Sequence, residues 1–181
     1  MKMRRSESGQ IIVLFVFGLV ALLALTALAI DGAMLYSTRR YDQGVADSSS
    51  LAAASVAAQT MDNLHIDRKT FNCSSANMAT VIQAAKDAAI ERAASNHFTL
   101  DDDISDQLGV QVTCGTSGMI KYLDIKVMIS SDVQTALIQL FYSGKPRTTV
   151  EATSRIKTRT SLAFGYGIAS TSTACVGNAS S

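Results

Sequence analysis

The sequence is poor in the residue types on which several classes of function depend. Its 181 residues include no Trp, two His, three Cys and one Pro, and aromatic residues make up only 6%. So few aromatic side chains leave little surface on which bases or sugars could stack. No two Cys have the two-residue spacing of common zinc motifs, and the low Pro and Gly content is unlike a disordered or collagen-like chain.

Charge and motifs exclude further classes. Lys and Arg number 16 and Asp and Glu 15, so the net charge is +1 and we expect no nucleic-acid partner. There is no G-x-S-x-G, P-loop or G-x-G-x-x-G. His65 and His97 lie far apart in polar segments, which favours surface positions, and the acidic segment 101–106 lacks the Gly and distal Glu of an EF-hand. We therefore predict a protein that is not an enzyme, with no cofactor, metal or small-molecule substrate.

One long apolar run stands out. Residues 11–30, from Ile11 through Phe15 and Leu22 to Ile30, carry no charge. Twenty helical residues span about 30 Å, the thickness of the hydrocarbon core of a bilayer. The run predicts a transmembrane anchor, followed by a water-soluble remainder.

Charges beside the run indicate its orientation. The basic stretch 1–10 contains Lys2, Arg4 and Arg5, whereas Asp31 follows the run directly. By the positive-inside rule the N-terminus is cytoplasmic and the remainder extracytoplasmic. This predicts a single-pass membrane protein with its C-terminal domain outside the cytoplasm.

A cleaved signal peptide is the alternative interpretation. Ala27-Leu28-Ala29 has the A-x-A pattern of a signal-peptidase site, which would make the chain a secreted small-domain binding protein or enzyme. The run is long for a signal peptide, however, and no helix breaker follows Ala29. Both features favour a retained anchor.

Residues 31–60 predict an extracytoplasmic helix that continues the anchor. The segment lacks Pro, and together with the anchor it would form one helix of about fifty residues and roughly 75 Å. Two helices broken near Gly32 or Gly44 are the alternative. Small residues such as Ala46 and Ala53 should let partner helices approach closely. One stripe of small or modest residues has helical spacing: Met34, Thr38, Tyr41, Val45, Ser48 and Ala52.

Residues 61–181 predict a small α+β domain with an irregular tail. Apolar spacing predicts a helix over 77–96, and alternation predicts strands over 110–113, 121–129 and 147–159. Ser131 and Gln134 form a capping-box pattern that predicts a short helix ending at Gly144. Strand, helix and strand together predict a βαβ unit with parallel strands. Residues 164–168 could add an edge strand.

The three cysteines would lie on the oxidising side of the membrane, where disulfides persist. A Cys73–Cys114 bridge would enclose the second predicted helix and stabilise the fold by about 4 kcal/mol in the loop-entropy model. The order of the elements favours this pair. Cys175 remains the rival partner for either residue.

The first part of the chain carries a set of residue types in a fixed order: Gly9-Gln10, Val13-Leu14-Phe15, Ile30-Asp31, Leu35-Tyr36, Arg39-Arg40, Gln43 and Ala46 to Ala53. In these residues the chain resembles the TadE/TadG-like family of Tad (tight adherence, or Flp) pilus-assembly proteins. The resemblance implies a structural protein of the Tad/Flp pilus system: an assembly factor, a minor pilin or a filament subunit. Its partners would be the membrane and other pilus subunits or copies of itself.

The resemblance also implies a candidate processing site at Gly9 and Gln10. Type IV pilins carry a Glu five residues after their cleavage site, and cleavage after Gly9 would place Leu14 there. This departure favours a membrane-retained assembly protein over a pilin.

Overall fold

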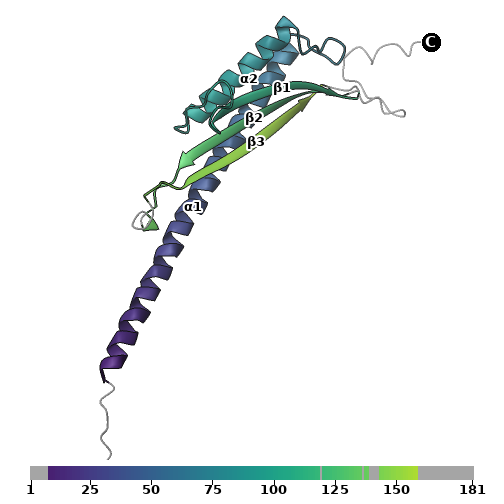
Figure 1. Cartoon of the computed structure of the whole chain (residues 1–181). Helices are drawn as coiled ribbons and strands as arrows, with labels where there is room; N and C mark the ends of the chain where they lie inside the picture. Colours follow the sequence, from purple (N-terminus) through teal and green to yellow (C-terminus); the bar gives the residue numbers. More distant parts are fainter. Residues whose placement is uncertain (1–7, 119, 136, 139–142, 159–181) are drawn as a thin grey trace, which may run out of the picture.

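A computed structural model describes residues 8–118, 120–135, 137–138 and 143–158. One helix, α1, runs along most of the molecule, and the other elements gather around its C-terminal half (Figure 1). The described elements are α1 (Ser8–Asn63), α2 (Ala76–Ala94), β1 (Gly109–Ser117), β2 (Ile120–Asp132) and β3 (Arg147–Lys157). The fold is α+β, as the sequence predicted. At 56 residues α1 is about 84 Å long, and it continues unbroken through Gly32 and Gly44.

The three strands form one antiparallel sheet in the order β1-β2-β3. Val127 in the central strand pairs with Val110 on one side and with Ala152 on the other. Gly118, with φ of +59°, adopts the left-handed conformation in the turn that joins β1 to β2. Both helices cover one face of the sheet, and its other face is open (Figure 1).

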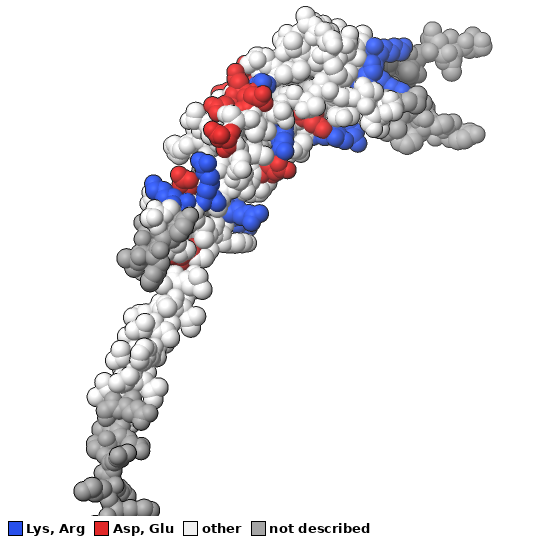
Figure 2. All heavy atoms as spheres, in the orientation of Figure 1, with Lys and Arg blue, Asp and Glu red and all other residues white. Residues whose placement is uncertain are grey.

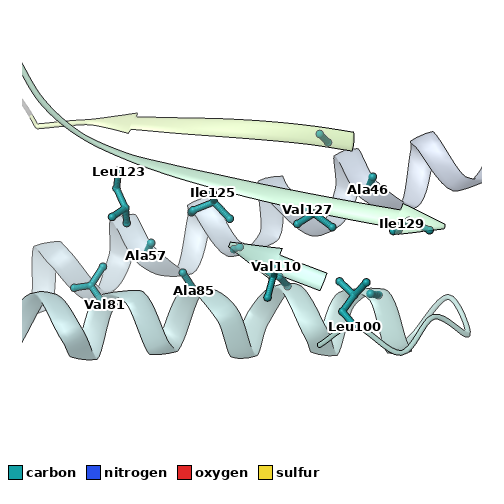
Figure 3. Close-up of a cluster of buried hydrophobic side chains, with 14 of the residues drawn as sticks. Ala46, Ala57, Val81, Ala85, Leu100, Val110, Leu123, Ile125, Val127 and Ile129 are labelled. Atoms are coloured by element: carbon teal, nitrogen blue, oxygen red, sulfur yellow. The ribbon is translucent and has the colours of Figure 1, made fainter. Parts of the chain in front are cut away.

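The core lies between the sheet and the two helices (Figure 3). The central strand contributes the large side chains Leu123, Ile125, Val127 and Ile129, all fully buried. The helices contribute mostly alanine at three- and four-residue spacing, and these methyl groups let α1 and α2 lie close to each other and to the sheet. The buried alanines of the helices are Ala46, Ala53, Ala57, Ala85, Ala89 and Ala93.

The predicted βαβ unit is wrong, because β2 and β3 are antiparallel neighbours. Ser131 belongs to β2 and does not cap a helix, and the backbone N–H of Val133 donates to the carbonyl of Pro146 at 2.7 Å, closing the two strands. Residues 133–135 are not helical; 136 and 139–142 lie outside the described residues. A twelve-residue helix would advance about 18 Å, whereas β3 spans about 36 Å, so the connection is too short for a parallel return.

The predicted packing stripe on α1 is displaced by about one residue. Met34 and Tyr41, which were assigned to it, are 44% and 53% exposed. The stripe that packs contains Asp31, Asp42, Val45, Ala46, Ser49, Ala53 and Ala57. The prediction followed apolar and modest-sized residues, whereas the buried stripe includes two carboxylates.

Ala46 and Ala53 also pack differently from the prediction. Both are completely buried within the chain's own core, so partner helices cannot reach them. The reason is that the second half of α1 serves as a core helix of its own domain. The predicted edge strand at 164–168 and the irregular tail lie outside the described residues.

Replacing Ala53 with Phe should destabilise the domain. The side chain has no exposed surface, and a ring there must push α1 away from its neighbours, at a cost of about 1–3 kcal/mol or more. Thermal denaturation followed by circular dichroism measures this. Leu51→Phe is the matched control, because Leu51 is 63% exposed on the same helix. Equal stability of the two variants would contradict the core position of Ala53.

Candidate membrane anchor and its junction with the domain

The first half of α1 is a bare apolar helix. Phe15, Leu22 and Ile30 are 69%, 64% and 50% exposed, and the most apolar window of the helix has no buried residue. Figure 2 shows no charged side chain on this part of the described helix. Within the described residues, α1 is the one helix long and apolar enough to cross a membrane. Apolar surface on all sides of a helix requires an apolar surrounding.

The single hydroxyl of the apolar segment is satisfied within the helix. The Oγ1 atom of Thr26 donates to the carbonyl of Leu22 at 2.6 Å. Such a bond to the preceding turn lets a hydroxyl lie in hydrocarbon without an unpaired polar group. The segment is therefore compatible with a bilayer over its full length.

Asp31 marks the end of this segment and the start of the folded domain. It is 1% exposed, and one carboxylate oxygen accepts from the backbone N–H groups of Leu137 and Ile138 at 3.1 and 2.6 Å. Both residues belong to the connection between β2 and β3. Hydrogen bonds to a carboxylate are stronger than those between neutral groups. Asp31 thus ties that connection to α1 where the apolar run ends.

Asp42 makes a second tie three helical turns further on. It is also 1% exposed, and its Oδ2 atom accepts from the hydroxyls of Ser131 at 2.5 Å and Thr148 at 2.8 Å. Ser131 stands near the end of β2 and Thr148 near the start of β3. A single buried carboxylate therefore joins α1 to both strands.

These two carboxylates were not recognised as anchoring groups from the sequence. Asp31 was taken only as the residue that follows the apolar run, and Asp42 was given no role. Their signal was helical spacing, because Asp31, Leu35, Thr38, Asp42 and Val45 follow one another at steps of four and three residues.

A disulfide bond joins two elements at the other end of the domain. Cys73 bonds to Cys114, with Cα atoms 5.7 Å apart, and so joins the loop before α2 to β1. This is the predicted pair; Cys175 lies outside the described residues. The preceding loop is ordered by Asp67, whose carboxylate accepts from the backbone N–H groups of Thr70 and Lys69, and these bonds hold the pKa of Asp67 below its usual value.

The open face of the sheet carries paired charges. Arg155 donates two bonds to Asp124, at 2.6 and 2.7 Å, and its guanidinium lies 4.3 Å from the ring centroid of Tyr122. Hydrogen bonding to Asp124 raises the pKa of Arg155 further. Lys126 pairs with Glu151 at 2.7 Å. The positive charge of Arg155 on β3 is thus balanced by a carboxylate on β2.

The remaining candidate residues do not form a chemical site. Within the described ranges, no three His, Cys, Asp or Glu side chains come together as metal ligands. Gly9 and Gln10 lie in the first turn of α1, and processing there stays a prediction. The geometry of this molecule thus centres on the bare helix and its junction with the domain.

Replacing Asp42 with Ala should destabilise the domain by roughly 2–3 kcal/mol, because the hydroxyls of Ser131 and Thr148 lose a shared charged acceptor. Urea denaturation in detergent measures this. Asp47→Ala is the control, because Asp47 is an exposed carboxylate on the same helix that accepts from the side chain of Gln43, a residue of α1 itself. If both substitutions cost the same, Asp42 is not the tie between α1 and the strands.

Comparison with known proteins gives one match. No curated protein and no solved structure matches the chain. Residues 9–58 match the family model described as "Putative Flp pilus-assembly TadE/G-like", which confirms the resemblance seen in the sequence. The matched residues cover nearly all of α1, including the bare segment, Asp31 and Asp42. The long helix of this protein is therefore similar to the TadE/G-like segment of Flp pilus-assembly proteins, and this supports a pilus-related role.

Proposed function

We propose that this protein is a non-enzymatic structural component of the Tad/Flp pilus system, held in the membrane by residues 11–30 and carrying its α+β domain outside the cytoplasm. The observation that carries the proposal is the continuity of α1. One unbroken helix is bare and apolar over its first half and is the core helix of a domain over its second half. A helix of this kind transmits the position of the membrane directly to the domain.

Two observations support the outward orientation of the domain. Three basic residues, Lys2, Arg4 and Arg5, precede the apolar run, as the positive-inside rule requires of a cytoplasmic N-terminus. The Cys73–Cys114 bridge is independent of this argument, because structural disulfides persist in oxidising compartments and are rare in the cytosol.

The retained anchor is favoured over a cleaved signal. α1 stays helical through Ala27, Ala29 and Asp31, and Asp31 is bound to the domain through Leu137 and Ile138. Membrane retention is also favoured over export into a filament, because Leu14 occupies the position at which a pilin processed after Gly9 would carry a Glu. The role proposed is accordingly that of a membrane-held assembly component, with minor pilin or filament subunit as the alternative.

Counting free thiols tests the orientation. Cells are lysed with a maleimide–polyethylene glycol reagent that adds a fixed mass to each free thiol. With the domain outside, at most one of the three cysteines should react before reduction and three after it, because Cys73 and Cys114 are bonded. Three modifications without reduction would mean that the domain faces the cytoplasm. Cys73→Ala is the control, and it should expose the thiol of Cys114.

Fractionation tests the role in the producing cell. The protein should remain in membranes after surface filaments are sheared off, and deletion of its gene should abolish those filaments while a plasmid copy restores them. Recovery in the sheared filaments, with an N-terminus at Gln10, would favour a filament subunit. An N-terminus at Ile30 or Asp31 in the medium, with filaments intact after deletion, would overturn the proposal in favour of a secreted protein.

A further inference from the structure

A shallow hollow of ≈ 440 Å³ lies on α1 between the bare segment and the body of the domain. Its residues follow one another at three- and four-residue steps on a face of the helix that lies beside the buried stripe. The hollow is lined by Tyr36, Arg39, Arg40, Gln43, Gly44 and Asp47. Most of these residues are exposed, and the domain borders the hollow at Gln43, whose side-chain amide donates to the backbone carbonyl of Glu151 on β3 at 3.2 Å.

The two arginines of the hollow differ from those of the sheet. Arg147 and Arg155 form ion pairs with Asp132 and Asp124, whereas no ion pair joins Arg39 or Arg40 to any residue in the described ranges. Figure 2 shows basic side chains where the charge-free part of α1 meets the domain. Two adjacent guanidinium groups in the open are suited to binding an anion such as a phosphate.

Gly44 is one of the residues that line the hollow. Apart from the neighbouring turns of α1 itself, no described heavy atom lies within 4 Å of the place where a Cβ at Gly44 would stand. Packing inside the domain therefore does not require a glycine here, although glycine weakens a helix relative to alanine. The absent side chain leaves room for a group from outside the chain.

The distance from the apolar run indicates which group that is. Tyr36 lies six residues beyond Ile30, or about 9 Å along the helix, and the arginines about 14–15 Å. The headgroup layer is roughly 5–7 Å thick on each side of the hydrocarbon. Side chains on a helix lean toward its N-terminus, so here they lean toward the membrane, and the long arginines can reach back to the phosphates. The ring of Tyr36, 69% exposed, then lies at the interface, where tyrosine is enriched.

We propose that this hollow binds the phosphate of an anionic phospholipid headgroup, in the leaflet on the domain's side of the membrane. Arg39 and Arg40 pair with the phosphate, Tyr36 packs beside the headgroup and Gly44 leaves space for it. Asp47 closes the end away from the membrane and repels an anion that would move further up the helix. The proposal rests on the proposed anchoring of α1, and it assigns the hollow the task of setting the depth and rotation of the helix.

A single tryptophan can report the lipid beside this site. The chain contains no Trp, so Tyr36→Trp introduces one at the interface and keeps an aromatic ring there. The full chain is reconstituted in vesicles of phosphatidylcholine with 20% phosphatidylglycerol, with bromine on the acyl chains of one lipid or the other. Brominated phosphatidylglycerol should quench the tryptophan more strongly than its 20% share of the lipid predicts, with a relative affinity on the order of fivefold per arginine. This excess quenching should decline as the salt concentration is raised.

Two variants remove the site in different ways. Arg39→Gln with Arg40→Gln should reduce the preference to the bulk lipid ratio. Gly44→Leu should reduce it by placing a bulky side chain in the hollow, and the core should be unaffected, because a Cβ there meets no atom of the domain. Arg68→Gln with Arg92→Gln removes the same charge elsewhere and should keep the preference.

The outcomes separate this proposal from the anchoring on which it rests. Equal quenching by both lipids in the parent chain would show an inserted helix without a headgroup site, and would overturn the inference alone. No quenching by either lipid would overturn the anchoring as well. A third outcome is that the parent chain forms an oligomer in the vesicles and the arginine variants dissociate it but keep the lipid preference. That result would mean that the hollow binds a second copy of the chain and not a lipid.

Discussion

The structure depends on the packing of the second half of α1 against the sheet through small side chains. Alanines on α1 and α2 face the large apolar side chains of β2, so each helix approaches the sheet closely and the domain forms around α1 (Figure 3). Among the described elements, α1 is the longest, and both α2 and the sheet pack against it. Displacing α1 would expose most of the core at once, and the α1 helix therefore cannot leave without unfolding the domain.

Polar contacts fix where along α1 the domain is attached. Alanine methyl groups alone would permit a one-turn shift of the helix, because the stripe repeats every turn. Three polar residues of α1 prevent such a shift, because each has a defined partner. Asp31 accepts from the backbone N–H groups of Leu137 and Ile138, and Asp42 accepts from the hydroxyls of Ser131 and Thr148. The hydroxyl of Ser50 bonds to that of Ser154. A shift would leave buried carboxylates without partners, which is costly. These groups set the height of the domain above the apolar segment.

This arrangement gives the protein a form suited to a structural role. The bare segment, the junction and the domain belong to one helix, so an event at the membrane is transmitted to the sheet without a flexible linker. The open face of the sheet has its charges paired across strands, at Arg155 with Asp124 and at Lys126 with Glu151. The junction face of α1 instead carries two exposed arginines, Arg39 and Arg40, that form no ion pair within the described ranges.

The sequence by itself determined the features that depend on local pattern. The apolar run, α2 and the strand alternation follow from hydropathy and periodicity. The absence of Pro favoured one long helix over two broken near Gly32 or Gly44, and the order of the elements favoured Cys73–Cys114 over a bond to Cys175. Only the tertiary structure decided the direction of β3, the face of α1 that packs and the partners of Ala46 and Ala53. The capping-box pattern at Ser131 was misleading because its hydroxyl binds Asp42, which is distant in the sequence. From the sequence alone, a carboxylate in a helix is predicted to be exposed to solvent. Its burial depends on hydrogen-bond donors that are distant in the sequence, and these are known only from the assembled fold.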